Sequence, residues 1–423
     1  MDPGIQTPEH IENGSPFTTS DHFRALAKLN QHSKIQNSTF TATGPLSFLQ
    51  SWTLPVQNPS LQLSSEAITG YREVFDLGVS LRARYPDFFS PGGPVHVFAN
   101  DYPRVIETAQ NFLRAYLGVN ASQGPVLGTV FAVNSTGSSS ALGNSLAPSD
   151  LCPNYHDDSG ANQTTIWGAT YNPATAERLQ KEYITSGYLN ITAADVATMQ
   201  YLCGFETAIC GTVSPFCHVF TAEEFRKYEY FQDLRYYYGN GPGSDEGKGK
   251  YMMFPFLASI ADMLDTDTYS NSTGDVGVLQ PLTMAFLNDG QISQLVAQIG
   301  VFDDEPALPS TYMPDSRKYV ASRFVSMRGT VAFERLSCGC GSKYLRVRLN
   351  DAVYPIPACQ SGPGRSCPVA QYKQYVEDKY ARSGGFLENC GANTTATESE
   401  VKTDFWTKYA QYVEEGWIRT VTP

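Results

Sequence analysis

The chain has few charged residues, and the cationic ones are the scarcer kind. Charged residues make up 17% of the sequence, with 30 Lys and Arg against 42 Asp and Glu, so the formal net charge is −12. Nucleic acids and anionic membrane surfaces bind clustered Lys and Arg, so neither is expected as a partner. The sequence also lacks any run of about 18 uncharged apolar residues, and it therefore predicts no transmembrane helix.

A signal peptide is missing as well, because the first residues, MDPGIQTPEH, are polar. Two other features still indicate the secretory pathway. Nine cysteines are typical of an oxidising compartment, and their odd number leaves at least one thiol without a partner in the chain. We expect an extracellular or secretory protein whose signal peptide has been removed, with N-linked glycans. The glycosylation sequons are at Asn13, Asn37, Asn120, Asn134, Asn162, Asn190, Asn271 and Asn393.

The order of predicted elements indicates an α/β fold with a mostly parallel sheet flanked by helices. Residues 64–85 have the apolar spacing of a long amphipathic helix. A strand at 94–98 leads through a polar turn to a helix at 104–117, and a second unit joins a strand at 282–287 to a helix at 291–300. Strand, turn and helix in this order predict a site at the carboxyl edge of the sheet.

The middle of the chain has a different pattern. Residues 149–276 are mostly helical and rich in Tyr, so we predict that they form an inserted helical domain. The α/β domain is then discontinuous and consists of residues 1–148 and 277–423. Near its end, residues 330–336 and 344–349 are predicted to be paired strands.

Five segments, in the correct order, resemble the histidine acid phosphatase family, in the branch that holds fungal phytases. They are LSSEAITGYREVFDLGVSLRARYP, VFANDYPRVIETAQNFL, FTAEEFRKYEYFQDLRYYYGNGPG, LNDGQISQLVAQIGVFD and VRLNDAVYPIPAC. The resemblance covers nearly the whole chain and implies a phosphoglycerate mutase-like sheet domain with a helical insertion. It also implies disulfides between Cys152 and Cys390 and between Cys359 and Cys367. A further bridge is expected between two of three cysteines: Cys203, Cys210 and Cys217.

Most residues that carry the family's chemistry are replaced in this sequence. The family uses an Arg-His-Gly-x-Arg-x-Pro run, in which a His attacks phosphorus between two Arg residues that clamp the phosphate. This sequence contains no Arg-His-Gly, and the resemblance aligns Glu12 with the first Arg and Asn13 with the His. Arg104 matches the family's third Arg. Asn288 replaces a phosphate-contacting His, and Asp289 matches the proton donor.

These replacements lower the expected charge of the pocket to about −1, which repels a phosphate dianion. Asn13 also cannot form a phosphohistidine. We therefore predict a non-phosphatase enzyme, without cofactor or metal, that cyclises, isomerises or eliminates from a small neutral molecule, in fungal natural-product biosynthesis. Glu12 and Asp289 are the predicted acid–base residues, and Arg104 stabilises an anion. Asn13 and Asn288 orient the substrate.

The alternative prediction is a catalytically silent, secreted pseudophosphatase. In that case Arg104 forms an ion pair with one of the two carboxylates, and the cleft or the surface binds a small ligand or a protein.

Overall fold

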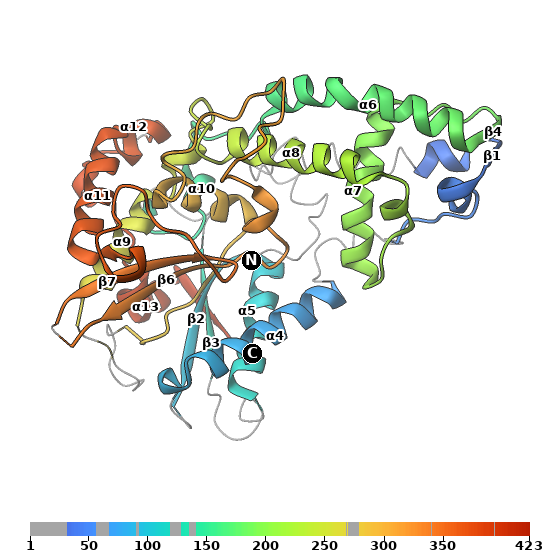
Figure 1. The fold of residues 1–423 in the computed structure, drawn as a ribbon. Coiled ribbons are helices and arrows are strands. Elements are labelled where there is room, and N and C mark those ends of the chain that lie inside the picture. The colour runs from blue at the N-terminus through green and yellow to red at the C-terminus, as the bar shows by residue number, and fades with distance from the viewer. Residues whose placement is uncertain are drawn as a thin grey trace.

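The computed structural model describes residues 32–55, 67–89, 93–118, 128–134, 141–267, 269, 279–339, 341–392 and 394–423. A part built around a sheet lies beside a part made mainly of helices (Figure 1). The strands are β1 (Phe40–Ala42), β2 (Val95–Asn100), β3 (Gly128–Val133), β4 (Ile184–Gly187), β5 (Ala285–Phe286), β6 (Val331–Ser337), β7 (Lys343–Leu349), β8 (Ala352–Val353), β9 (Cys367–Pro368) and β10 (Ile418–Val421). The helices are α4 (Ile68–Arg84), α5 (Pro103–Leu117), α6 (Ala161–Tyr183), α7 (Ala193–Cys210), α8 (Ala222–Gly239), α9 (Phe254–Asp265), α10 (Asp289–Ile299), α11 (Val369–Arg382), α12 (Phe386–Cys390) and α13 (Phe405–Glu414).

The central sheet has the strand order β10-β3-β2-β5. β2 pairs in parallel with β3 and with β5, whereas β10 pairs antiparallel with β3 at the edge. The sheet is mostly parallel, which confirms the predicted α/β class. The strand predicted at 282–287 is shorter than expected, because its pairing with β2 is limited to Ala285 and Phe286.

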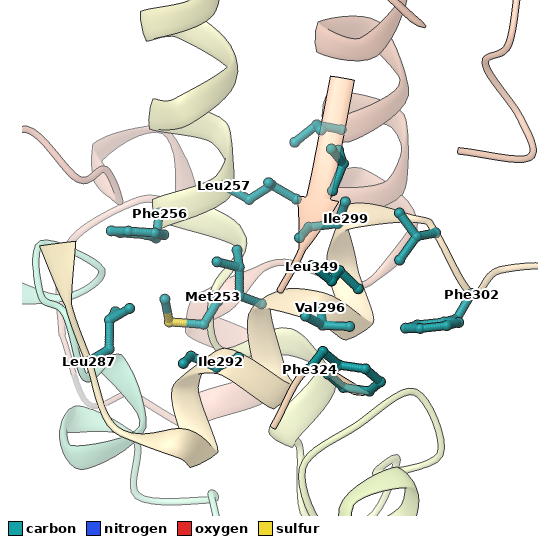
Figure 2. Close-up of a cluster of buried hydrophobic side chains, with 14 of the residues drawn as sticks. Met253, Phe256, Leu257, Leu287, Ile292, Val296, Ile299, Phe302, Phe324 and Leu349 are labelled. Carbon is teal, nitrogen blue, oxygen red and sulfur yellow. The ribbon is translucent and has the colours of Figure 1, made fainter. Parts of the chain in front are cut away.

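Alternate residues of the central strands face opposite sides of the sheet, and helices cover both sides. Val97 and Ala99 of β2 pack in one hydrophobic cluster with α4 and α5. Phe98, which lies between them, packs on the other side in a cluster with residues of α9, α10 and α13. Figure 2 shows part of this second cluster, where side chains of α9 and α10 meet. The sheet is therefore fixed from both faces, and its carboxyl edge is held in place.

A second, antiparallel sheet contains β6, β7 and β8, with β9 also paired to β7. β6 and β7 pair from Val331 with Leu349 to Ser337 with Lys343, which confirms the paired strands predicted here. Leu345, Val347 and Leu349 alternate along β7 and enter the same core cluster as Phe98.

The helical part has a hydrophobic cluster of its own. Side chains of α6, α7 and the segment between α7 and α8 form it, and Leu46, Leu49 and Trp52 join it from the N-terminal side of the chain. The described residues 35–52 thus pack with the helices. The division of the chain into a sheet domain and an insertion at 149–276 remains a prediction.

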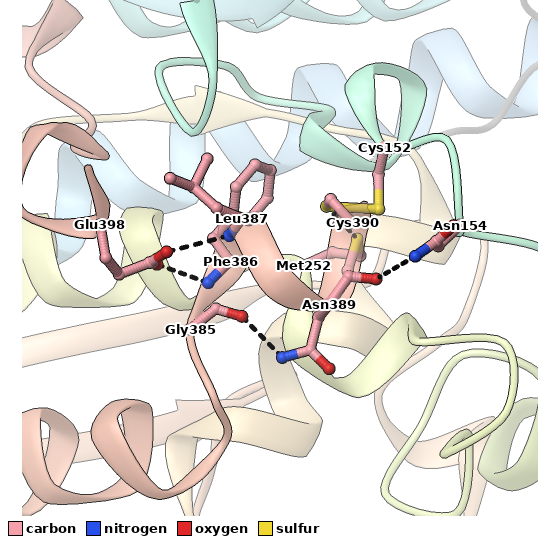
Figure 3. The surroundings of a disulfide bond; sticks show 9 residues. All are labelled: Cys152, Asn154, Met252, Gly385, Phe386, Leu387, Asn389, Cys390 and Glu398. Carbon is pink, nitrogen blue, oxygen red and sulfur yellow. Dashed lines mark hydrogen bonds between the residues drawn. A yellow bond between two sulfur atoms is a disulfide. The ribbon is translucent and has the colours of Figure 1, made fainter. Parts of the chain in front are cut away.

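Three disulfides join Cys152 to Cys390, Cys203 to Cys217 and Cys359 to Cys367. The first and third confirm the bridges implied by the family resemblance, and the second shows which two of three candidate cysteines are paired. Figure 3 shows the surroundings of the first bridge, which links the loop before α6 to α12. Cys210 and Cys338 are free and exposed, and Cys340 lies outside the described residues. Within the described residues, no helix is long and apolar enough to cross a membrane.

A capping box and an ion pair stabilise the start of α8. The Thr221 hydroxyl accepts a hydrogen bond from the Glu224 amide, and the Glu224 carboxylate accepts one from the Thr221 amide at 2.8 Å. Arg178 of α6 donates to both carboxylate oxygens of Glu224, at 2.9 and 2.7 Å. Burial acts to raise the pKa of Glu224, but the donors on Arg178 and Thr221 outweigh it and hold that pKa below its usual value.

Glu224→Gln is expected to destabilise the protein at neutral pH and much less at acidic pH. The pKa of Glu224 is lower in the folded protein than in the unfolded chain. The carboxylate therefore stabilises the fold fully at pH values above its unfolded-state pKa, and this stabilisation is lost as the pH falls through its folded-state pKa. We expect the free energy of unfolding to fall by about 1–2 kcal/mol at about pH 7 and by little near pH 3. Urea unfolding at the two pH values measures this.

Glu223→Gln is the matched control, because Glu223 is exposed and pairs with Arg226 and Lys227 on the helix surface. Its effect should stay below about 0.5 kcal/mol at either pH. An equal loss of stability for Glu224→Gln at both pH values would show that the carboxylate charge contributes nothing.

Candidate active site at the carboxyl edge of the sheet

The candidate site lies where β2 and β5 end. The two strands pair in parallel, with Phe98 opposite Ala285 and Ala99 opposite Phe286. The backbone therefore leaves both strands at the same edge of the sheet. After β2 the chain turns and begins α5, which places Arg104 in the first turn of that helix. After β5 it reaches Asn288 and begins α10 at Asp289. Three of the predicted site residues are therefore brought to one edge.

Arg104 is one of the largest fully buried side chains, with 2% of its surface exposed. Its guanidinium carbon lies 5.4 Å from the ring centroid of Tyr102, within the range of a cation–π contact. The Tyr102 hydroxyl in turn donates a hydrogen bond to the carboxylate of Asp150. The first turn of α5 thus places a buried guanidinium beside the backbone amides of the helix N-terminus, and positive charge at such a position favours an anion.

Asp289 is held from the helical part of the molecule. The hydroxyl of Tyr236, near the end of α8, donates a hydrogen bond to Oδ2 of Asp289 at 2.9 Å. Asn288, the N-cap residue of α10, is 6% exposed, and its Oδ1 accepts no hydrogen bond from the described residues. A carboxyl group and a carboxamide oxygen thus lie together at the N-terminus of α10.

A buried polar network lies behind the carboxyl group. The Tyr155 hydroxyl donates to Oδ1 of Asn240 at 2.6 Å, and Nδ2 of Asn240 donates to Asp157 at 2.6 Å. Nε2 of Gln294, on α10, also donates to Oδ1 of Asn240, at 3.2 Å. Burial, with the nearby charges of Asp157, Asp150 and Asp289, raises the pKa of Tyr155 well above its usual value. Tyr155 therefore stays protonated and acts as a donor.

Asn100 is a further candidate at this edge that the sequence analysis did not single out. It ends β2 and is fully buried, and neither atom of its carboxamide has a hydrogen-bond partner among the described residues. An unpaired buried carboxamide costs about 1–3 kcal/mol, which a ligand can offset. The available signal was a polar Asn directly after the apolar run of a strand.

The comparison with known families identifies this arrangement. The family model of the histidine phosphatase superfamily, branch 2, matches residues 17–350. The chain belongs to this family. Phytase PHO112 of Candida albicans is 30% identical over 394 residues, which cover 91% of this chain and 80% of that protein.

Two further relatives agree with this. Acid phosphatase PHO1 of Komagataella pastoris is 30% identical over 374 residues, covering 86% of this chain and 75% of that protein. The crystal structure of the phytase from D. castellii superimposes with a TM-score of 0.80 at 25% identity, over 96% of this chain and 82% of that one. This likeness confirms the predicted fold, a histidine phosphatase sheet with a helical part.

The relatives overturn the predicted function. A cyclase, lyase or isomerase is wrong, and so is a silent pseudophosphatase, because proteins that match most of this histidine phosphatase chain are named as phytases and acid phosphatases. The error has a physical source. The prediction counted charged side chains at a few motif positions and left out the backbone, although α5 and α10 both begin at this edge. Each helix N-terminus carries about half a positive charge, which favours an anion.

The structure describes three of the five predicted site residues. Glu12 and Asn13 lie outside the described residues. Arg104, Asn288 and Asp289 lie at one edge, and their roles remain predictions. Where the structure is described, no group of three or more His, Cys, Asp and Glu side chains is placed to hold a metal ion.

Proposed function

We propose that this histidine phosphatase chain hydrolyses phosphate monoesters of small molecules. The observation that carries the proposal is its 30% identity to Phytase PHO112 over 91% of the chain. The site supports it, because buried Arg104 and the N-termini of α5 and α10 offer positive charge at the edge where Asp289 supplies a carboxyl group. An ester phosphate bound there has its oxygens near Arg104 and the carboxamide of Asn100, and its leaving oxygen near Asp289.

Asp289 is proposed to act as the general acid. A water oxygen attacks phosphorus, the bond between phosphorus and the ester oxygen breaks, and Asp289 gives its proton to the leaving alkoxide. A proton of the attacking water then restores the carboxyl group. Water is proposed as the nucleophile because the sequence contains no Arg-His-Gly, and the Asn13 aligned with the family's His has no nucleophilic nitrogen.

The proposal is tested by assaying the purified protein with an aryl phosphate and with phytate, from about pH 3 to pH 8. Asp289→Asn should lower kcat by about 10²–10³-fold with little change in KM, because the carboxyl group acts in the transition state. Asp304→Asn is the control, since Asp304 is exposed and pairs with Lys318 away from the edge. Its kinetic constants should equal those of the wild type.

Two outcomes would contradict different parts of the proposal. A wild-type protein that binds inorganic phosphate but hydrolyses neither ester would overturn the phosphatase function. A radiolabelled phosphoenzyme trapped by acid quench would retain that function and replace water by a protein nucleophile.

We further propose that the protein is secreted and glycosylated. Three disulfides support an oxidising compartment. The sequon residues Asn37, Asn162 and Asn190 are exposed, so an oligosaccharide can be attached without unfolding the chain. A fall in apparent mass after endoglycosidase treatment of protein secreted from a fungal host tests this, and unchanged mass would overturn it.

A further inference from the structure

We propose that Tyr236 is a positioning residue for Asp289, through which the helical part controls the acid step of the sheet domain. This inference rests on the proposed function, because it gives Asp289 the role of proton donor. Its direct observation is the 2.9 Å hydrogen bond from the Tyr236 hydroxyl to Oδ2 of Asp289. Tyr236 belongs to α8 and Asp289 begins α10, 53 residues later.

The hydrogen bond belongs to a built contact between the end of α8 and α10. The side chain of Asn240, directly after α8, accepts from Gln294 of α10 at 3.2 Å. The fully buried hydroxyl of Tyr319 lies 3.3 Å from that of Ser293 on the same helix. A Cβ on Gly241 would lie 2.8 Å from the Tyr319 hydroxyl and 2.7 Å from the Tyr236 carbonyl. The turn after α8 is therefore packed too closely against Tyr319 for a side chain at position 241, and Tyr319 in turn contacts Ser293 of α10.

The Tyr236 ring also contacts a cation. The guanidinium carbon of Arg235 lies 4.4 Å from the centroid of this ring, in cation–π contact. A ring fixed by both the helix contact and this cation presents its hydroxyl in one direction. The hydrogen bond to Asp289 is thus preorganised and needs no rearrangement when substrate binds.

A fixed donor on Oδ2 assigns different tasks to the two oxygens of the carboxyl group. Oδ2 accepts from Tyr236, so Oδ1 carries the proton that is transferred to the leaving oxygen. Without the hydroxyl, the carboxyl group rotates and its proton is on the correct oxygen less often. The ionised carboxylate also loses a donor, which shifts the balance toward the protonated form.

Tyr236→Phe is the decisive variant, because it removes one oxygen atom and keeps the ring. We expect kcat to fall about 10–100-fold while KM changes by less than about 2-fold, and the alkaline limb of the pH–rate profile to move to higher pH. Tyr238→Phe is the matched control on the same helix, since the Tyr238 hydroxyl donates to the Leu308 carbonyl at 2.7 Å, outside the site. A merely structural role for Tyr236 would lower kcat for both variants in proportion to lost stability and leave the pH profile unmoved.

A binding measurement separates this inference from the proposed function. The loss of affinity for inorganic phosphate at high pH should occur at higher pH in Tyr236→Phe than in the wild type, because the variant lacks a hydrogen-bond donor to the carboxylate. Isothermal titration calorimetry measures it without any turnover. If the pH dependence of phosphate binding differs between the wild type and Tyr236→Phe but the wild type hydrolyses neither ester, the phosphatase function is overturned and the positioning of Asp289 by Tyr236 is supported. Superimposable binding and rate profiles for the wild type and Tyr236→Phe would overturn the role of Tyr236 alone.

Discussion

Arg104→Ala is expected to lower kcat/KM for phosphate monoesters by at least about 10³-fold, since a buried guanidinium that binds the transferred phosphoryl group acts mainly in the transition state. The effect is expected to be large because Arg104, which the family resemblance matches to a phosphate-binding arginine, is 2% exposed. No bulk water replaces its charge at that depth. Steady-state kinetics with an aryl phosphate measure the loss.

Two further variants make this result specific. Arg104→Lys should recover only part of the activity, because an ammonium group supplies charge without the planar pair of donors that fits a phosphate. Arg114→Ala removes an exposed arginine from the same helix and should leave kcat/KM unchanged. Full activity in Arg104→Ala, with the fold intact by circular dichroism, would show that phosphate binds elsewhere.

Much of the fold could be predicted because its signals are local. The apolar spacing at 64–85 matches α4 closely, and the strand, turn and helix at 94–117 correspond to β2 and α5. Such patterns depend on residues within one element, where a period of 3.6 or 2 decides which face is buried. The predicted length of β5 was too great, because an apolar run does not show how many of its residues pair with a neighbouring strand. Here two of them pair.

The site was less predictable because its contacts join distant segments. The family resemblance, together with the order of strands and helices, predicted that Arg104, Asn288 and Asp289 belong to one site. The structure brings the three residues to one edge, and their roles stay predictions. Tyr236 and Asn240 were not predicted there, because their positions depend on how the end of α8 packs against α10. No local pattern in either segment encodes that packing. The functional prediction failed for a related reason, since helix N-termini contribute charge that a list of side chains omits.

Removal of the Cys152–Cys390 disulfide is expected to have the largest effect on stability of any substitution considered. The bridge joins residues 238 positions apart, and closing so long a loop in the unfolded chain is entropically costly. In the chain-entropy model the bridge stabilises the folded state by about 5 kcal/mol. This is a large fraction of the stability of an ordinary protein, about 5–15 kcal/mol.

The surroundings of the bridge support a large effect. Cys390 is fully buried, and Nδ2 of Asn154 donates to the carbonyl of Asn389 at 3.3 Å beside it (Figure 3). The backbone amides of Phe386 and Leu387, at the start of α12, donate to Glu398. The disulfide thus fixes α12 to the loop that continues to Tyr155, the donor in the polar network behind Asp289.

The double variant Cys152→Ala/Cys390→Ala is compared with Cys359→Ala/Cys367→Ala, whose cysteines are 8 positions apart. The chain-entropy model gives about 2.5 kcal/mol for the shorter loop, half the value for the longer one. Urea unfolding under one set of conditions measures both losses. We also expect the long-range variant to lose activity, because the loop that carries Tyr155 is released, whereas the short-range variant keeps it. Equal losses of stability would show that native packing at each bridge, rather than the constraint on the unfolded chain, sets the contribution of these disulfides.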